Sequence, residues 1–426
     1  MADDEELLDD WFITSLKSYR HLHMFDLPKP TCVIEWIDNN CICVAGCEPN
    51  ANNEILELSI PAKLMQQEGT TAAGLTKDRD FKMKSGGFSG QPVHCMKYLQ
   101  GSSRRLIVTG SHLSTDLNVW QLGTETTDVV KKLSSLPGSG VERSGVKVID
   151  QRPGCQGQVA FGSTLSDVQI VDVETSKVVR TKLGSASYNV EIQFLDDDNL
   201  VMCNTTSGHI NIHDMRATSS QSETPSQYAN EAASSEIRGN IDQSNEGLDT
   251  LSPERTNENV SNKEEISWTF DLSCSSDIPN EGDTKKRKMD STTATIARLS
   301  TNNEVIVNDL RNLAKPLHTV RLDDSKKLHP STESLAVKWS PTTKHMISVS
   351  GLNECVDIHD ITPWQQSSTS PPISKPIFRH EGHMFAESAN QQTRILCHTW
   401  HPWKPQVMMS SGNDGSLHAW DWSTVS

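Results

Sequence analysis

Short apolar runs alternate with polar turns along most of this chain, and the same order recurs several times. Each copy contains an apolar run, a turn of Ser, Gly or Asn, and a stretch in which apolar and polar residues alternate. Runs and alternations of this length predict short β-strands joined by tight turns. The seven copies, of which the first is the faintest, cover residues 41–59, 107–121, 159–172, 200–214, 294–309, 346–360 and 410–422.

The spacing of the copies indicates a single repeat. A propeller blade of four strands takes about 40 to 45 residues, and most intervals between successive copies are of that order. The interval from residue 214 to residue 309 is much longer, and we assign the excess to an insertion at 217–292. In the six copies after the first, the position that matches the aspartate of Trp420-Asp421 is residue 121, 172, 214, 309, 360 and 421.

The last copy is nearly complete and identifies the type of blade. Gly382-His383 precedes it, and Trp420-Asp421 closes it, as in a blade of the WD type. Because each repeat buries its faces only against its neighbours, seven copies form one cooperative ring. The sequence therefore predicts an all-β fold, a seven-bladed WD40-type β-propeller over residues 20–426.

The two ends of the chain predict how the ring closes. Only four residues follow Trp422, too few for the outermost strand of the last blade. Residues 20–27 precede the first blade, and we expect them to supply that strand and remove an open sheet edge. Residues 1–19 have the apolar stripe of an amphipathic helix. This helix either packs on the propeller edge or offers Trp11 and Phe12 to a partner.

Charge and composition narrow the class of partner. The formal net charge is −16, and the Ser-rich stretch 217–265 has too few apolar side chains to offset the entropy of ordering. We therefore expect the acidic insertion 217–292 to be largely disordered. An acidic chain argues against direct nucleic-acid binding, and no secretory signal or membrane-spanning run is visible. We predict a soluble, intracellular protein without a membrane partner.

Ser, His and Asp residues in the last blade resemble a catalytic triad, but we interpret them as structural. His383, Ser411, Asp414 and Trp420 match the hydrogen-bonded tetrad of WD blades, in which the imidazole bridges the serine and the aspartate. No nucleophile elbow or oxyanion loop accompanies them. We therefore predict a protein that is not an enzyme and has no catalytic residues.

A cluster of histidines raises the question of a metal. His380, His383, His398 and His401 are paired at a spacing of three residues, which suits a helix better than the strands and turns predicted here. No phosphate-binding glycine loop, Walker lysine or Cys-x-x-Cys pair is present. We therefore predict neither a metal nor a cofactor.

Two basic features allow alternative interpretations. Lys285, Lys286, Arg287 and Lys288 form either a nuclear import signal or a solvated loop. Two successive copies end in Asp-x-Arg, which places Arg216 and Arg311 where WD proteins that deliver substrates to cullin-4 ubiquitin ligases bind their adaptor. A substrate receptor of such a ligase is therefore an alternative function.

Two elaborate connections suggest a surface that binds a protein partner. We assign residues 66–88 to the link between blades one and two and residues 381–394 to the entry of blade seven. Links of this kind emerge on one face of a propeller and would form one patch. Its anchors would be an arginine and aromatic side chains, unless these pack under their own loops. The candidates are Arg79, Phe81, Phe88 and Phe385.

Several segments, inside and outside the repeats, resemble the WD repeat-containing protein 73 family from end to end. They are residues 9–19, 33–46, 53–61, 78–89, 398–402 and 418–422. The resemblance implies a non-enzymatic cytoplasmic scaffold that binds and stabilises the RNA endonuclease module of the Integrator complex and masks its active site. It also implies an association with mitotic spindle poles and microtubules. The insertion 217–292 departs from the family pattern, so its features are not transferred.

Overall fold

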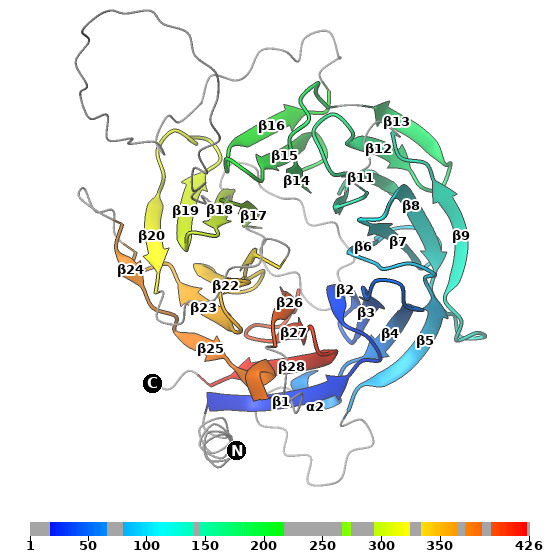
Figure 1. The fold of residues 1–426 in the computed structure, drawn as a ribbon, viewed down its shortest axis with the longest axis horizontal. Helices are drawn as coiled ribbons and strands as arrows, with labels where there is room; N and C mark the ends of the chain where they lie inside the picture. The colour runs from blue at the N-terminus through cyan, green and yellow to red at the C-terminus, as the bar shows by residue number, and fades with distance from the viewer. Residues whose placement is uncertain are drawn as a thin grey trace, which may run out of the picture.

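The computed structural model describes residues 18–65, 80–139, 145–181, 183–216, 266–273, 294–323, 334–364, 371–385 and 393–423. In this part of the chain, seven sheets surround a common axis, and the N-terminal strand lies at the outer edge of its sheet (Figure 1). The chain therefore forms a seven-bladed β-propeller, as its repeats predict. None of the described helices is long and apolar enough to cross a membrane.

Each blade is a meander of antiparallel strands, and blades are numbered here from β2. Blade one consists of β2 (Thr31–Asp38), β3 (Cys41–Gly46), β4 (Glu54–Ser59) and β5 (Lys82–Phe88). Blade two consists of β6 (Cys95–Tyr98), β7 (Leu106–Ser111), β8 (Ser114–Gln121) and β9 (Lys131–Leu136). Blade three consists of β10 (Val148–Gln151), β11 (Gln158–Gly162), β12 (Gln169–Asp172) and β13 (Lys177–Thr181). Blade four has three strands among the described residues, β14 (Val190–Phe194), β15 (Asn199–Asn204) and β16 (Ile210–Asp214).

The remaining blades include one irregular pairing. Blade five consists of β17 (Trp268–Leu272), β18 (Thr295–Ser300), β19 (Glu304–Asp309) and β20 (His318–Leu322). Blade six consists of β21 (Ala336–Trp339), β22 (Met346–Ser350), β23 (Val356–Asp360) and β25 (Phe378–His380). The short β24 (Ile373–Ser374), from the connection between β23 and β25, pairs in parallel with β20. Blade seven consists of β26 (Ile395–Trp400), β27 (Met408–Gly412), β28 (Ser416–Trp422) and β1 (Tyr19–Asp26).

The core is divided into seven hydrophobic clusters among the described residues, one at each junction between neighbouring blades. Strand β3 shows how the sequence produces them. Ile42 and Val44 pack toward blade seven, whereas Cys41, Cys43 and Ala45 pack toward blade two. A strand with neighbours on both faces needs apolar residues at every position, which explains why β3 is a continuous apolar run.

The N-terminal strand closes the ring, as the shortage of chain after Trp422 predicts. β1 pairs antiparallel with β28, in a register that places Leu22 opposite Trp420. The backbone N–H of Leu27 donates to the carbonyl oxygen of Gly415 at 2.8 Å. Tyr19 belongs to β1, so the predicted helix cannot extend to residue 19. Residues 1–17 lie outside the described residues.

The long segment before β5 has a different place from the one predicted. β5 pairs with β4, so residues 66–81 join the third and fourth strands of blade one rather than blades one and two. They leave from the face where β2 and β4 end, because Cys41 pairs with Ser59. The chain enters β26 at the opposite face, after the helical turn η1 (Gly382–Phe385). The described ends of the two connections therefore lie on opposite faces of the ring.

The acidic insertion follows β16 in the sequence, and Lys285, Lys286, Arg287 and Lys288 fall between β17 and β18. These four residues and the stretch 217–265 lie outside the described residues. The short helix α2 (Ala62–Met65) follows β4.

Candidate functional site

One polar side chain on the innermost strand of each of blades one to five contacts the next blade, and Lys338 of blade six contacts Asp271 of the preceding blade. Side chains on β2, β10, β14 and β17 accept the backbone N–H of Tyr98, Phe194, Leu272 and Trp339 at 3.1, 2.7, 3.2 and 2.7 Å. Each acceptor group therefore holds the first strand of the following blade. The set, called the inner ring below, is Glu35, Lys97, Asp150, Gln193, Asp271 and Lys338.

The charged members of the inner ring are paired with one another. Nζ of Lys97 lies 3.4 Å from Oδ1 of Asp150 and 3.9 Å from Oε1 of Glu35, and Nζ of Lys338 lies 3.7 Å from Asp271. Burial raises the pKa of Glu35 and of Asp271, whereas the negative charge of Glu35 raises the pKa of Lys97. These groups are engaged in joining blades, which leaves them poorly suited to proton transfer with a substrate.

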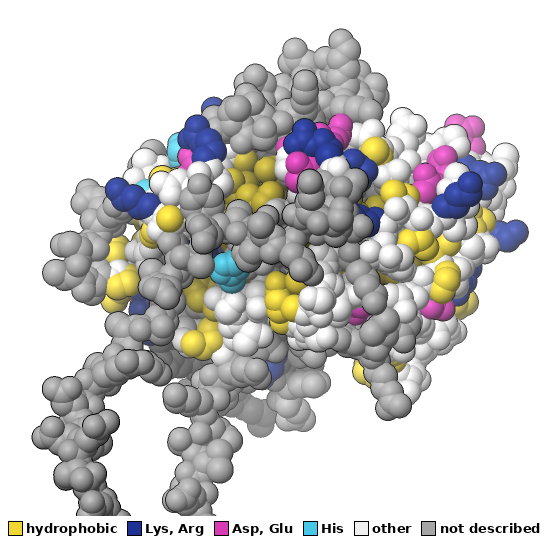
Figure 2. Space-filling model, turned by 90° about the horizontal axis from the view of Figure 1, so that it is seen from above, with side chains coloured by type: hydrophobic (Ala, Val, Ile, Leu, Met, Phe, Trp, Pro, Cys, Tyr) yellow, Lys and Arg dark blue, Asp and Glu magenta, His cyan; other side chains and the backbone are white. Residues whose placement is uncertain are grey.

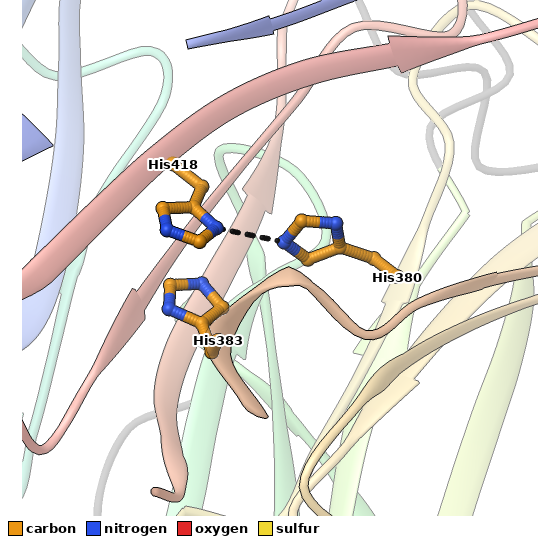
Figure 3. A group of neighbouring side chains, drawn as sticks. All are labelled: His380, His383 and His418. Atoms are coloured by element: carbon orange, nitrogen blue, oxygen red, sulfur yellow. Dashed lines mark hydrogen bonds between the residues drawn. The ribbon is translucent and has the colours of Figure 1, made fainter. Parts of the chain in front are cut away.

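Three buried histidines meet at the entry of blade seven. His380 ends β25, His383 lies in η1 and His418 lies on β28. The rings of His383 and His418 stack with centroids 3.7 Å apart, and Nε2 of His380 lies 3.1 Å from Nδ1 of His418 (Figure 3). The fold thus brings together side chains from three elements around one hydrogen-bonded group.

The imidazole of His383 holds the last blade together through two serines. Its Nε2 lies 2.8 Å from Oγ of Ser410 and its Nδ1 lies 2.6 Å from Oγ of Ser416. Ser416 in turn donates to Asp414 at 2.6 Å, and the indole N–H of Trp420 donates to Ser410 at 3.1 Å. His383, Asp414 and Trp420 therefore belong to one network, with Ser416 as an additional member.

Ser411 is not part of this network, and the prediction for that residue is wrong. Its hydroxyl donates to the backbone carbonyl of Thr31 in blade one at 2.7 Å. Neighbouring side chains on a strand point to opposite faces, so Ser410 faces His383 while Ser411 faces the next blade. Because the two serines are adjacent, the sequence alone does not show which of them contacts His383.

The histidine group has the contacts of a hydrogen-bonded network. Its ligand atoms lie within 4.8 Å of one another, which is compatible with a metal on distance alone. However, both ring nitrogens of His383 already contact serines, and Nδ1 of His380 lies 2.7 Å from the Tyr19 hydroxyl. The stacked rings of His383 and His418 also direct their in-plane lone pairs along parallel planes rather than toward one point.

His398 and His401 have other partners. His398 lies 2.8 Å from the hydroxyls of both Ser348 and Ser350, and Nε2 of His401 lies 3.0 Å from the carbonyl oxygen of Asn39. Burial lowers the pKa of His418 and of His401 to about 4 and that of His398 to about 3. Burial also holds the pKa of His380 and of His383 well below the usual range. All five imidazoles are therefore neutral at pH 7.

Both Asp-x-Arg boxes form exposed ion pairs. The guanidinium of Arg216 contacts Asp214 at 2.8 and 3.0 Å, and Nε of Arg311 contacts Asp309 at 2.9 Å. The hydrogen bond from Arg216 lowers the pKa of Asp214 to about 2. The two boxes follow the third strands of adjacent blades, β16 and β19, and so lie on the same face of the ring.

The surface seen in Figure 2 carries basic and acidic side chains next to each other, with small hydrophobic patches between them. The ion pairs of Asp198 with Arg152 and Arg216 have this mixed character, with separations of 3.9 and 3.7 Å. A surface of alternating sign suits contacts with a protein better than the uniform positive field that attracts a nucleic acid.

Of the four predicted partner anchors, the structure describes the side chains of Phe81 and Phe88. Phe81 is buried in the core between blades seven and one, where its ring centroid lies 5.4 Å from that of Phe25. Phe88, at the end of β5, is 60% exposed. Arg79 and the side chain of Phe385 lie outside the described residues. Phe81 therefore cannot anchor a partner, because its own blade already covers it.

Exposed apolar side chains lie on the outer edges of blades one and two, and the sequence analysis singled out only Phe88 among them. The two edges are joined, because Gly86 N–H donates to Asp128 and Val130 N–H donates to Gly86, both at 2.9 Å. The set, called the outer rim below, is Met83, Phe88, Val129 and Leu133, with exposed fractions of 67, 60, 55 and 39%.

These features define the class of the protein: a WD40-type β-propeller closed by its N-terminal strand, with its buried polar groups engaged in joining blades. The chain is 32% identical to Integrator complex assembly factor WDR73 of Danio rerio over 99% of its own length and 98% of that protein. It is 30% identical to the proteins of the same name from Mus musculus and Homo sapiens, each over at least 97% of both chains. No protein-family model matches the chain. The chain belongs to the WD repeat-containing protein 73 family.

Proposed function

We propose that this protein is a non-enzymatic assembly factor of the Integrator complex. The observation that carries the proposal is the similarity, over nearly the full length, to relatives that are named Integrator complex assembly factors. The arrangement of polar groups supports it. The inner ring and the His383 network are engaged within the fold, so the described residues are better suited to presenting surfaces than to chemistry.

The proposed partner is the RNA endonuclease module, which this protein would bind, stabilise and keep inactive by masking its active site. The outer rim is our candidate contact within the described residues. Exposed aromatic and Met side chains are the types that dominate interface energetics and are enriched at contacts. The hydrogen bonds of Gly86 to Asp128 and Val130 hold the two outer edges as one surface.

Affinity purification with quantitative mass spectrometry tests this proposal. The tagged full-length chain should recover the endonuclease subunits in near-equal amounts, and its depletion should shorten their lifetime. Phe88→Ser combined with Val129→Ser should reduce the recovery by more than about tenfold, since loss of a central apolar anchor commonly costs about 2 kcal/mol or more. The melting temperature should stay near that of the parent.

A matched control lies on the outer strand of blade three. Val178 and Val179 on β13 are exposed to a similar degree but lie outside the outer rim. Val178→Ser with Val179→Ser should leave recovery unchanged. Equal recovery of the endonuclease subunits with the parent and both double variants would place the contact elsewhere. If the parent recovers no endonuclease subunits, the proposed partner is rejected.

The second candidate function is that of a substrate receptor of a cullin-4 ubiquitin ligase. The Asp-x-Arg boxes favour it, because Arg216 and Arg311 are exposed and held by their own aspartates on one face. Arg216→Ala with Arg311→Ala should then abolish recovery of a cullin adaptor. Recovery of endonuclease subunits without any adaptor would reject this candidate.

We further propose that the protein acts in the cytoplasm and associates with spindle poles and microtubules in mitosis. The resemblance to the family is the only support for these two assignments. Fluorescence imaging through the cell cycle and co-sedimentation with purified microtubules test them. A protein confined to the nucleus, or absent from sedimented microtubules and spindle poles, would contradict them.

A further inference from the structure

Two thiols lie against each other where blade one begins. Cys32 is on β2 and Cys47 directly follows β3, and their Sγ atoms are 2.7 Å apart. We propose that Cys32 and Cys47 form a reversible disulfide that fastens the start of blade one next to the ring closure. This would be a site of oxidative modification in a chain whose proposed function requires no redox chemistry.

The backbone holds the two thiols in this position. The pairing of β2 with β3 shifts register between Thr31 and Val33, which leaves Cys32 as the extra residue of a bulge. The N–H of Cys47 donates to the carbonyl of Pro30 at 2.9 Å, and its thiol lies 3.3 Å from the same oxygen. A disulfide bond is about 2.05 Å long, so closing it requires only a small movement of two side chains.

Exposure and ionisation favour reaction at this pair over the other thiols. Cys32 is partly exposed, so a small reagent can reach it. The hydrogen bond with Cys32 lowers the pKa of Cys47, whereas burial raises the pKa of Cys43, Cys203 and Cys397. Because the thiolate is the nucleophile in thiol–disulfide exchange, the raised pKa values protect these three thiols.

The reaction is an exchange with a low-molecular-weight disulfide such as oxidised glutathione. Once it is singly ionised, the pair shares one proton between the two sulfur atoms. The more exposed Cys32 sulfur attacks one sulfur of that disulfide while the proton remains on Cys47, which forms a mixed disulfide and releases one thiolate. The Cys47 thiolate then attacks Sγ of Cys32, forms the Cys32–Cys47 bond and releases the second thiolate. The two protons lost by the cysteines end on the two released thiols. The protein pair is oxidised by two electrons, and the small disulfide is reduced to two thiols.

The position of the bond gives it a structural consequence. The chain passes from β1, the strand that closes the ring, through residues 27–30 directly into β2. Ser411 of blade seven donates to the carbonyl of Thr31, next to Cys32. A bond between Cys32 and Cys47 would restrain the first two strands of blade one at the junction with blade seven. The oxidised ring should therefore open less readily than the reduced ring.

Peptide mapping of the full-length protein tests the bond. The protein is equilibrated with mixtures of reduced and oxidised glutathione, blocked with N-ethylmaleimide in denaturant, and cleaved after glutamate. Cleavage after Glu35 and Glu54 separates Cys32 from the segment with Cys41, Cys43 and Cys47. We expect a linked pair of peptides, with fragmentation placing the bond at Cys47, and a higher melting temperature than in the reduced protein.

Three variants make the outcome decisive. Cys32→Ser and Cys47→Ser should each abolish the linked pair and the rise in melting temperature, and Cys47→Ser should leave glutathione attached to Cys32. Cys397→Ser removes a neighbouring thiol at the same junction and should change neither result. The inference is overturned if the parent yields only glutathione adducts, a bond to Cys41, Cys43 or Cys397, or no rise in melting temperature on oxidation.

Discussion

The hydroxyl of Tyr19 lies 2.7 Å from Nδ1 of His380, although 361 positions separate the two residues in the sequence. The contact joins the first strand of the chain to the last strand of blade six. The Tyr19 ring also meets Phe378 and Trp420 edge to face, with centroids 5.2 and 6.4 Å apart. β1 is therefore held by side chains of two blades as well as by its pairing with β28.

Removing the closing strand should destabilise the whole ring. Deletion of residues 1–27 exposes the edge of β28 and uncovers the cluster around Trp420, so we expect a lower melting temperature and lower solubility. Differential scanning fluorimetry and a sedimentation assay measure the two effects. Deletion of residues 1–17 retains β1 and is the matched control. Equal melting temperatures for the parent and the longer deletion would reject closure by β1.

The histidine network predicts the effect of a single substitution. His383→Ala removes the partner of both Ser410 and Ser416 in a fully buried site, so the free energy of unfolding should fall by roughly 1 to 3 kcal/mol. Urea unfolding followed by tryptophan fluorescence measures the change. The exposed His209 offers a comparison, since its replacement by alanine should change stability by less than about 0.5 kcal/mol.

The buried imidazoles predict acid sensitivity. Burial lowers the pKa of His359, His401 and His418 to about 4, whereas an unfolded histidine has a pKa of about 6.5. The unfolded chain therefore binds more protons between these values. The contribution of these histidines to the free energy of unfolding is fully present above about pH 6.5. It falls as the pH drops toward 4, by up to about 1.4 kcal/mol per pH unit for each histidine. Urea midpoints that stay constant from pH 7 to pH 5 would contradict this.

The inner ring predicts that blades are coupled by single side chains. Asp271→Ala leaves the N–H of Trp339 without its acceptor and Lys338 without its partner, so we expect a loss of about 2 to 4 kcal/mol. The loss should appear in one cooperative unfolding transition. Asp128→Ala removes an exposed carboxylate and should have little effect. A loss no larger than that of Asp128→Ala would show that the inner ring contributes little to joining the blades.

The number of blades could be predicted from the sequence because it depends on local pattern. Continuous apolar runs such as β3 arise wherever a strand is buried on both faces. These features survive in each copy, however degenerate its turn residues are.

Other features depend on contacts that no local pattern specifies. The choice between Ser410 and Ser411 rests on the strand register, and the burial of Phe81 rests on its contact with Phe25 across blades seven and one. The segment 66–81 was assigned to the wrong connection because the length of a loop does not reveal which two strands it joins. The parallel pairing of β24 with β20 has no signature in the sequence.

The pairing of β1 with β28 also determines when the molecule can be completed during its synthesis. The ribosome makes β1 first and β28 last, so the earliest strand has no partner until almost the entire chain has emerged. A nascent chain therefore keeps an unpaired strand at its front and an unfinished blade at its rear throughout translation. Contacts between such distant segments form slowly and leave partly folded chains open to aggregation. The edge of β1 consequently stays without its strand partner for as long as β28 has not been made.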